Sequence, residues 1–148
     1  IEYRILRKLN FRKQSLFAVG IIDLDGFKAV NDKHGHHRGN QVLLQFSQIL
    51  KKACRSSDIV ARLGGDEFAI ILHSIHHADH LQAIAESLLA SCKEPLDFNG
   101  QLIHFSFSLG IAFSQFADNP DDLVMQADQA MYKAKNLNPH WFLYKPEI

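Results

Sequence analysis

The chain has 148 residues, which is long enough for one domain with a sizeable core and too short for two ordinary domains. Its 16 basic and 16 acidic side chains cancel, so no overall field favours nucleic acid or a membrane surface, and no nucleic-acid partner is expected. The two cysteines, the absence of a signal peptide and the lack of a membrane-spanning apolar run predict free thiols and a cytoplasmic location, with any membrane anchor elsewhere in a longer protein.

The first third of the chain predicts two helices around a buried strand. Apolar residues recur at helical spacing over residues 1–9, which indicates an amphipathic helix. The continuous apolar run 16–22 is typical of a central strand buried on both faces. Phe27 and Val30 anchor a short helical turn that the loop 35–39 breaks, and a long amphipathic helix is expected to begin near Asn40.

The middle of the chain predicts two hairpins separated by a helix. Apolar runs at 59–61 and 68–72 flank a Gly-Gly pair, and glycine takes the positive φ of a tight turn without strain. Helical spacing returns over 78–92. A small β-excursion over 95–103 turns at Asn99-Gly100, which is a strong hairpin signal.

The last third predicts a strand, a capped helix and a final strand. Bulky and small side chains alternate over 105–113, so one face of this strand allows close approach of a helix or ligand. Asn119 and Pro120 form a helix start, with Asn as the cap and Pro at the first position. A final strand is expected over 141–144. Strands and helices mix without strict βαβ alternation, so the predicted fold class is α+β.

Carboxylates lie at the ends of two predicted strands. Asp66 and Glu67 sit at the hairpin tip, and Asp23 follows the run 16–22. Neighbouring strand residues point to opposite faces, so only one of Asp66 and Glu67 is expected to dominate a single site. Together with Asp23 they would form an oxygen-rich site suited to Mg²⁺ and a polyphosphate. The alternative is a solvated turn, where Asp and Glu are common.

Five sequence blocks follow one another over roughly residues 17 to 135. They are DLDGFKAVND at 23–32, Gly35-His36, RLGGDEF at 62–68, SLGIA at 108–112 and ADQAMYKAK at 127–135. With these blocks the chain resembles the GGDEF domains, or diguanylate cyclases. The resemblance implies a single domain over 1–148, without the family's N-terminal Asp-x-Leu-Thr turn, and a central mostly antiparallel sheet flanked by helices, akin to polymerase palm domains.

The resemblance also implies an activity and a metal site. Two such domains meet as a homodimer, and two GTP molecules are condensed into cyclic di-GMP and pyrophosphate. Asp23 and Asp66 would hold Mg²⁺ (or Mn²⁺) through their side chains, and Leu24 through its carbonyl. Glu67 would assist a second metal or the attacking 3′-hydroxyl, so Asp66 and Glu67 are the expected catalytic residues. For Asp23, the alternative is a cap of the following turn.

Five further positions would contact GTP by the same resemblance. Lys28 would contact phosphate, Asn31 the guanine edge, His36 the same pocket, and Lys135 the terminal phosphates; Asn40 stands where the family usually has an Asp that binds guanine. The first four of these have plainer alternatives, namely a surface lysine for Lys28, a turn cap for Asn31, a structural loop histidine for His36 and a solvated helix end for Lys135.

Arg55 and Asp58 form an RxxD sequence just before the hairpin. The spacing matches the family's inhibitory product site, where Arg suits bidentate phosphate or guanine contacts and Asp accepts from guanine N–H groups. A charged helix-to-strand loop is the alternative.

Two departures from the family pattern weaken the case for turnover. Asn40 has one acceptor oxygen where a carboxylate has two, and Pro139 stands where the family has a phosphate-binding arginine. A second hypothesis is therefore a weak or inactive domain that binds GTP or cyclic di-GMP and regulates an adjacent EAL phosphodiesterase domain. Residues 142–148 resemble the start of a linker to such a domain. A scaffold that binds no nucleotide is a third possibility.

Four histidines, at positions 73, 76, 77 and 80, have metal-like i, i+3 and i+4 spacing. No Cys or acid completes an obvious ligand set, and the segment spans a strand end and a helix start. A zinc site is therefore not expected there.

Overall fold

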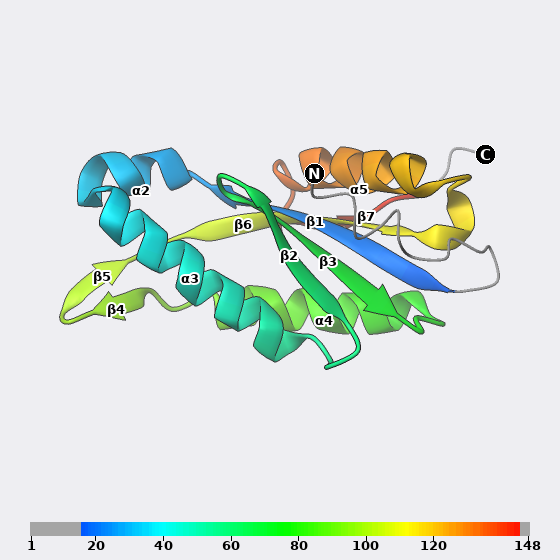
Figure 1. The fold of residues 1–148 in the computed structure, drawn as a ribbon, viewed down its shortest axis with the longest axis horizontal. Helices are drawn as coiled ribbons and strands as arrows, with labels where there is room; N and C mark the ends of the chain where they lie inside the picture. Colours follow the sequence, from blue (N-terminus) through cyan, green and yellow to red (C-terminus); the bar gives the residue numbers. More distant parts are fainter. Residues whose placement is uncertain (1–15, 146–148) are drawn as a thin grey trace.

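The core of the molecule is a five-stranded sheet in the order β2-β3-β1-β6-β7 (Figure 1). The computed structural model describes residues 16–145, so the helix expected over 1–9 lies outside the described residues. Only β6 and β7 are parallel; the other pairs are antiparallel. The strands are β1 (Phe17–Asp25), β2 (Ile59–Gly64), β3 (Glu67–His73), β6 (Ser106–Phe113) and β7 (Trp141–Leu143). The predicted α+β class with a mostly antiparallel sheet is confirmed.

Helices cover both faces of the central strand β1. On one face lie α3 (His36–Ala53) and α4 (Ala78–Ser91), and α5 (Pro120–Ala134) packs on the other (Figure 1). Ile22 points into the α3–α4 core, whereas Ile21 points into the α5 core, and both are fully buried. Burial on both faces explains why this strand is a continuous apolar run rather than an alternating one.

The backbone of α5 lies directly against β6. The predicted cap is confirmed, because Asn119 Oδ1 accepts a hydrogen bond from the Asp122 backbone N–H at 2.8 Å. Gly110 is the point of closest approach: a Cβ there would clash with backbone atoms of Ala127 and Met131. The small face expected for this strand therefore receives a helix.

The segment after β1 forms two helices rather than a short turn and a late helix. α2 spans Phe27–His34, and α3 begins at His36 instead of near Asn40. The break between them is confined to Gly35, whose φ of 87° is in the region that favours glycine. The loop expected over 35–39 is thus helical after its first residue.

The small β-excursion is confirmed as the hairpin β4 (Leu96–Phe98) and β5 (Gln101–Ile103), which forms its own two-stranded sheet. It packs against α2 and α3 at one end of the molecule (Figure 1). Arg38 of α3 lies 4.7 Å from the centroid of the Phe98 ring. The hairpin therefore braces the junction between α2 and α3.

The described chain ends on the edge strand β7. Phe142 and Leu143 pair with Gly110 and Ile111 of β6, and the Tyr144 backbone N–H donates to the Ile111 carbonyl at 2.8 Å. Residues 142 and 143, where a linker was expected to start, therefore belong to the sheet, and Tyr144 is hydrogen-bonded to its edge. Within residues 16–145, no helix has the length and apolar character needed to cross a membrane.

Candidate functional site

The site begins at the end of β1. Asp23 and Asp25 are residues of this strand rather than of a loop after it, because they pair with Ser108 and Ser106 of β6. Asp23 also lies opposite Glu67 in the antiparallel pairing with β3. Directly opposed residues share a face, so the strand register brings two carboxylates together at this end of the sheet.

The hairpin tip adds a third carboxylate. Asp66 lies in the turn, its carbonyl accepts the Leu24 backbone N–H at 3.1 Å, and Arg62 Nη2 donates to the Gly65 carbonyl at 2.7 Å. Burial and then the charge of Asp23 raise the pKa of both Asp66 and Glu67. Asp66 is a turn residue and Glu67 begins β3, so the strand alternation behind the expectation that one of them would dominate does not apply to this pair.

Lys135 supplies the positive charge among these acids. It follows the last residue of α5, and its Nζ lies 2.6 Å from Asp23 Oδ2 and 3.7 Å from Asp25 Oδ1. Burial acts to lower the pKa of Lys135, but the hydrogen bond with Asp23 and the nearby acidic charges outweigh it and raise the pKa. The alternative of a solvated lysine at a helix end does not describe this residue.

Asp25 is a centre of hydrogen bonds that sequence reasoning missed. Its Oδ2 accepts from Ser106 Oγ at 3.0 Å, its Oδ1 accepts from Ser108 Oγ at 2.8 Å, and His140 Nδ1 lies 3.3 Å from Oδ2. The signal in the sequence was the small face of β6, whose serines share a face of the sheet with Asp25. Nothing local relates Asp25 to His140, which is 115 residues away in the sequence.

The residues expected to bind the nucleotide lie on α2 and α3. Lys28 is exposed on α2, Asn31 is half-buried on the same helix, and His36 is the first residue of α3. Asn31 packs against the backbone of Gly39 in α3. The α2–α3 junction thus gathers the three positions, but it does not place them among the carboxylates.

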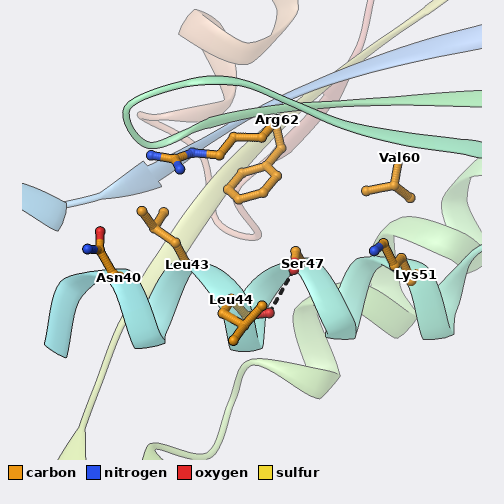
Figure 2. Close-up of a pocket in the computed structure, with 8 residues that line it drawn as sticks. Asn40, Leu43, Leu44, Ser47, Lys51, Val60 and Arg62 are labelled. Carbon is orange, nitrogen blue, oxygen red and sulfur yellow. Dashed lines mark hydrogen bonds between the residues drawn. The ribbon is translucent and has the colours of Figure 1, made fainter. Parts of the chain in front are cut away.

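Asn40 opens onto a cavity of about 500 Å³ between α3 and the β2–β3 hairpin. Leu43 and Phe68 contribute apolar surface, and Lys51 and Arg62 contribute positive charge. Figure 2 shows Arg62 reaching from the hairpin toward the Asn40 end of the cavity, with Leu43 beneath it. Among the described residues no acidic side chain lines this cavity, so its electrostatics favour an anionic ligand with an apolar part.

Arg55 and Asp58 are bound to each other and to β3. Asp58 Oδ2 accepts from the Arg55 backbone N–H at 2.8 Å, Oδ1 accepts from the His73 N–H at 3.1 Å, and the Arg55 guanidinium donates to the His73 carbonyl. The Asp58 side chain is 0% exposed, whereas that of Arg55 is 43% exposed. Burial acts to raise the pKa of Asp58, but these hydrogen bonds outweigh it and lower the pKa. Asp58 therefore organises the loop, and Arg55 is the member of the pair that a ligand can reach.

Metal-binding clusters are limited in the part of the chain that the structure describes. There, no group of three or more His, Cys, Asp or Glu side chains is arranged to hold a metal ion, and this includes the histidines at positions 73, 76, 77 and 80. A cation at the end of β1 would thus bind few carboxylates and complete its coordination with backbone, water or phosphate oxygens, as Mg²⁺ commonly does.

The two cysteines are free and half-buried. Burial raises the pKa of Cys54 to about 11 and that of Cys92 to about 12. Both thiols are therefore protonated at neutral pH, and neither provides a reactive thiolate.

Comparison with known proteins decides the family. Residues 3–139 match the family model described as "Diguanylate cyclase, GGDEF domain". The chain belongs to this family. Its GGDEF motif at 64–68 is the hairpin tip described above, and the resemblance drawn from the sequence blocks is confirmed.

Relatives with assigned names agree with this membership. The chain is 40% identical over 134 residues to diguanylate cyclase TpbB of Pseudomonas aeruginosa, a match that covers 89% of this chain and 31% of that protein. It is 38% identical over 126 residues to the bifunctional diguanylate cyclase/cyclic di-GMP phosphodiesterase MucR of the same organism, covering 84% of this chain and 18% of the relative. The chain therefore spans a third or less of these proteins.

The fold also matches a solved GGDEF domain. The crystal structure of the GGDEF domain of PA1120 (YfiN or TpbB) from Pseudomonas aeruginosa superimposes with a TM-score of 0.83 at 36% identity. The match covers 99% of this chain and 92% of that structure. The whole GGDEF architecture is thus shared, including the elements that carry Asp23, Asp66 and Lys135.

Proposed function

We propose that this GGDEF domain is a diguanylate cyclase that condenses two GTP molecules into cyclic di-GMP and two pyrophosphates. The observation that carries the proposal is the position of the GGDEF hairpin tip beside the end of β1. There Asp23 binds the Lys135 ammonium at 2.6 Å, lies opposite Glu67 in the sheet, and acts through its charge on both Asp66 and Glu67. Carboxylates crowded in this way suit a divalent cation and a polyphosphate. Relatives of the chain that carry the same domain are named diguanylate cyclases.

The residues present fit a divalent cation. The charge of Asp23, after burial, raises the pKa of Asp66, so these carboxylates lie close enough to repel each other, and one already binds the Lys135 ammonium. The side chains of Asp23 and Asp66 and the Leu24 carbonyl would hold Mg²⁺ or Mn²⁺, with Glu67 beside them. When bound, the cation would offset the charge of the triphosphate and of the departing pyrophosphate.

The side chains of the protein would do the remaining work. Burial and acidic neighbours raise the pKa of Glu67, which suits a group that accepts the proton of the attacking 3′-hydroxyl. Lys28 and Lys135 would offer their ammonium groups to the phosphates. Each 3′-hydroxyl must attack the α-phosphate of the other nucleotide in line, so two protomers must face each other, and the active unit is a homodimer.

Asn31, His36 and Asn40 would hold the base at the α2–α3 junction. Asn40 offers one acceptor to the two guanine N–H groups that a carboxylate would satisfy together, and its amide N–H₂ meets another donor. An unsatisfied buried donor costs about 1–3 kcal/mol, so the affinity for GTP falls by roughly ten- to a hundred-fold or purine selectivity relaxes.

Product inhibition would act through Arg55. Its guanidinium is the exposed member of the RxxD pair and suits a phosphate or a guanine edge, while buried Asp58 holds it in place. The expected inhibitor is cyclic di-GMP, and replacing Arg55 by Ala should relieve the inhibition without changing the initial rate.

Two residues favour a second function: Asn40, and Pro139, which stands where the family has a phosphate-binding arginine. In this alternative the domain binds GTP or cyclic di-GMP with little turnover and regulates an adjacent EAL phosphodiesterase domain. One relative is named as a bifunctional cyclase and phosphodiesterase, so domains of this family occur in such proteins.

The experiment that separates the two functions follows the fate of GTP. The protein, stripped of bound nucleotide, is incubated at high concentration with GTP and Mg²⁺, and products are separated by chromatography. Cyclic di-GMP that disappears in Asp66→Ala but persists in Glu86→Ala, a control at an exposed acid of α4, would establish the cyclase. If a longer dimerising form of the chain also makes no product, and calorimetry shows nucleotide binding, the regulatory function is correct.

A further inference from the structure

The Lys135 ammonium lies between two carboxylates that are two residues apart on β1. It hydrogen-bonds Asp23 Oδ2 at 2.6 Å, and Asp25 Oδ1 lies 3.7 Å from the same nitrogen. Lys135 is thus already bound to Asp23, the side chain that the proposed metal site needs as a ligand. A divalent cation on Asp23 and an ammonium at hydrogen-bond distance from the same oxygen would repel each other strongly.

Asp25 differs from Asp23 in how firmly it is held. Ser106 and Ser108 donate to its two oxygens from β6, and His140 contacts it from the segment before β7. Ser108 is fully buried, so its hydroxyl has little freedom to leave this bond. The Asp25 carboxylate is therefore fixed by three groups and is available as a rigid second partner for a neighbouring cation.

Lys135 is free to exchange between these partners, whereas the helix that carries it is not. The α5 backbone is pressed onto Gly110 of β6, which fixes the helix against the sheet. The Lys135 side chain remains partly exposed, at 32%, and its flexible four-carbon stem can span the short distance between the two carboxylates.

We propose that Asp25 is a positioning residue that receives the Lys135 ammonium when a divalent cation binds Asp23. The exchange frees Asp23 for the cation and keeps the ammonium next to the site, where it can meet a phosphate. The inference rests on the metal site of the proposed function, but it assigns to Asp25, Ser106, Ser108 and His140 a task that this function does not require.

The test is a double-mutant cycle with Mn²⁺ as the probe and no nucleotide present. Mn²⁺ affinity is measured from paramagnetic broadening of amide NMR signals in the wild type, Asp25→Asn, Lys135→Met and the double variant. Asp25→Asn removes a negative charge that attracts Mn²⁺, and this lowers the affinity whether residue 135 is Lys or Met. When Lys135 is present, the same substitution also leaves the ammonium without its second partner, so it stays on Asp23 and competes with Mn²⁺. We expect the factor by which Asp25→Asn lowers Mn²⁺ affinity to be about five-fold larger when residue 135 is Lys than when it is Met.

Asp128→Asn is the matched control. Asp128 is an exposed acid of α5 whose charge also reaches Glu67, so its replacement removes the same charge without removing a partner for Lys135. Its effect on Mn²⁺ affinity should be equal in the Lys135 and Met backgrounds. Equal losses for Asp25→Asn in the two backgrounds would overturn the proposal.

A crystal structure of the wild-type chain with Mn²⁺ gives a direct second answer, which stands even if Asp25→Asn does not fold. With the ion on Asp23, Lys135 Nζ should lie within hydrogen-bond distance of Asp25. An ion on Asp23 with the ammonium still bound there would overturn this inference and leave the proposed function intact. No Mn²⁺ at Asp23, in the crystal or by NMR, would overturn both this inference and the metal site of the proposed function.

Discussion

The end of β1 and the Arg55–Asp58 loop are built from the same kinds of residue, but their electrostatics are opposite. At the end of β1, burial and neighbouring charge raise the pKa of Asp66 and Glu67, because the acids there outnumber the partners that stabilise their charges. In the loop, backbone and guanidinium donors lower the pKa of Asp58. The first region is left with repulsion that a ligand can relieve, and the second has none.

The difference teaches how to separate functional from structural acids in this chain. A carboxylate with a raised pKa is less stable as an anion in the folded protein than in the unfolded chain, so its charge lowers the stability of the fold. Such destabilising charges are common at active sites. A carboxylate whose ionised form is favoured stabilises the fold. The same RxxD sequence therefore contains one structural residue, Asp58, and one exposed residue, Arg55.

The largest expected effect is a loss of activity without a loss of stability. Asp66→Asn keeps the shape of the side chain but removes a charge that the proposed cation site needs. We expect cyclic di-GMP formation to fall by about 1,000-fold, measured by chromatography. Thermal unfolding of the same variant should occur at an unchanged or higher temperature, because its raised pKa means that ionised Asp66 opposes folding at neutral pH.

The reverse is expected in the loop. Asp58→Asn leaves a buried group with poorer acceptors for the Arg55 and His73 N–H donors. The free energy of unfolding should fall by about 2–3 kcal/mol, measured by urea denaturation, while the initial cyclase rate per folded molecule stays near that of the wild type. Ser57→Ala, in the same exposed loop, is the control. A stable Asp58→Asn variant would contradict the structural assignment of this residue.

A third prediction extends the comparison to the base pocket. Asn40→Asp restores a second acceptor for the guanine N–H groups. We expect the affinity for GTP to rise by roughly ten- to a hundred-fold while that for ATP does not rise, measured by calorimetry. Asn40→Ala serves as the control, and equal gains for both nucleotides would show that Asn40 does not contact the base edge.

The smallest effect is on the pH dependence of stability. The pKa of Asp58 is lowered by folding, so its contribution is complete above the unfolded value of 3.8 and is lost as the pH falls through the folded value. Asp58→Asn should flatten this acid limb in thermal unfolding below about pH 4. The pKa of Asp66 is raised, so Asp66→Asn should have the opposite effect: its gain in stability appears as the pH rises above the unfolded value.

Local signals were sufficient to predict most of the fold. The continuous apolar run gave the buried strand, the Gly-Gly pair gave the β2–β3 hairpin, and Asn119-Pro120 gave the start of α5. Each depends on residues within one turn or one strand. The prediction was wrong at the start of α3. A glycine-containing loop was expected over residues 35–39, but a positive φ at Gly35 is enough to break the helix, and α3 begins at His36.

The site was predictable only in part, because its key contacts are long-range. The motif indicated Asp23, Asp66 and Glu67, but Lys135 and Asp23 are 112 positions apart in the sequence, so no local pattern indicates their hydrogen bond. The role of Asp25 depends on the register of β1 with β6, which brings Ser106 and Ser108 opposite the acids. A register shift of one residue would turn both serines away, and nothing in the sequence near Asp25 reports the register.

The contact of α5 with Gly110 has a consequence beyond packing. Because the backbone of α5 touches β6 at Gly110, this contact determines the distance between the helix and the sheet. It therefore also determines how far the Lys135 side chain can extend toward β1. A methyl group at position 110 would push α5 away from the sheet and move the Lys135 ammonium away from β1. Gly110→Ala would then resemble an active-site mutation in its effect, although residue 110 is not among the residues proposed to bind or transform a nucleotide.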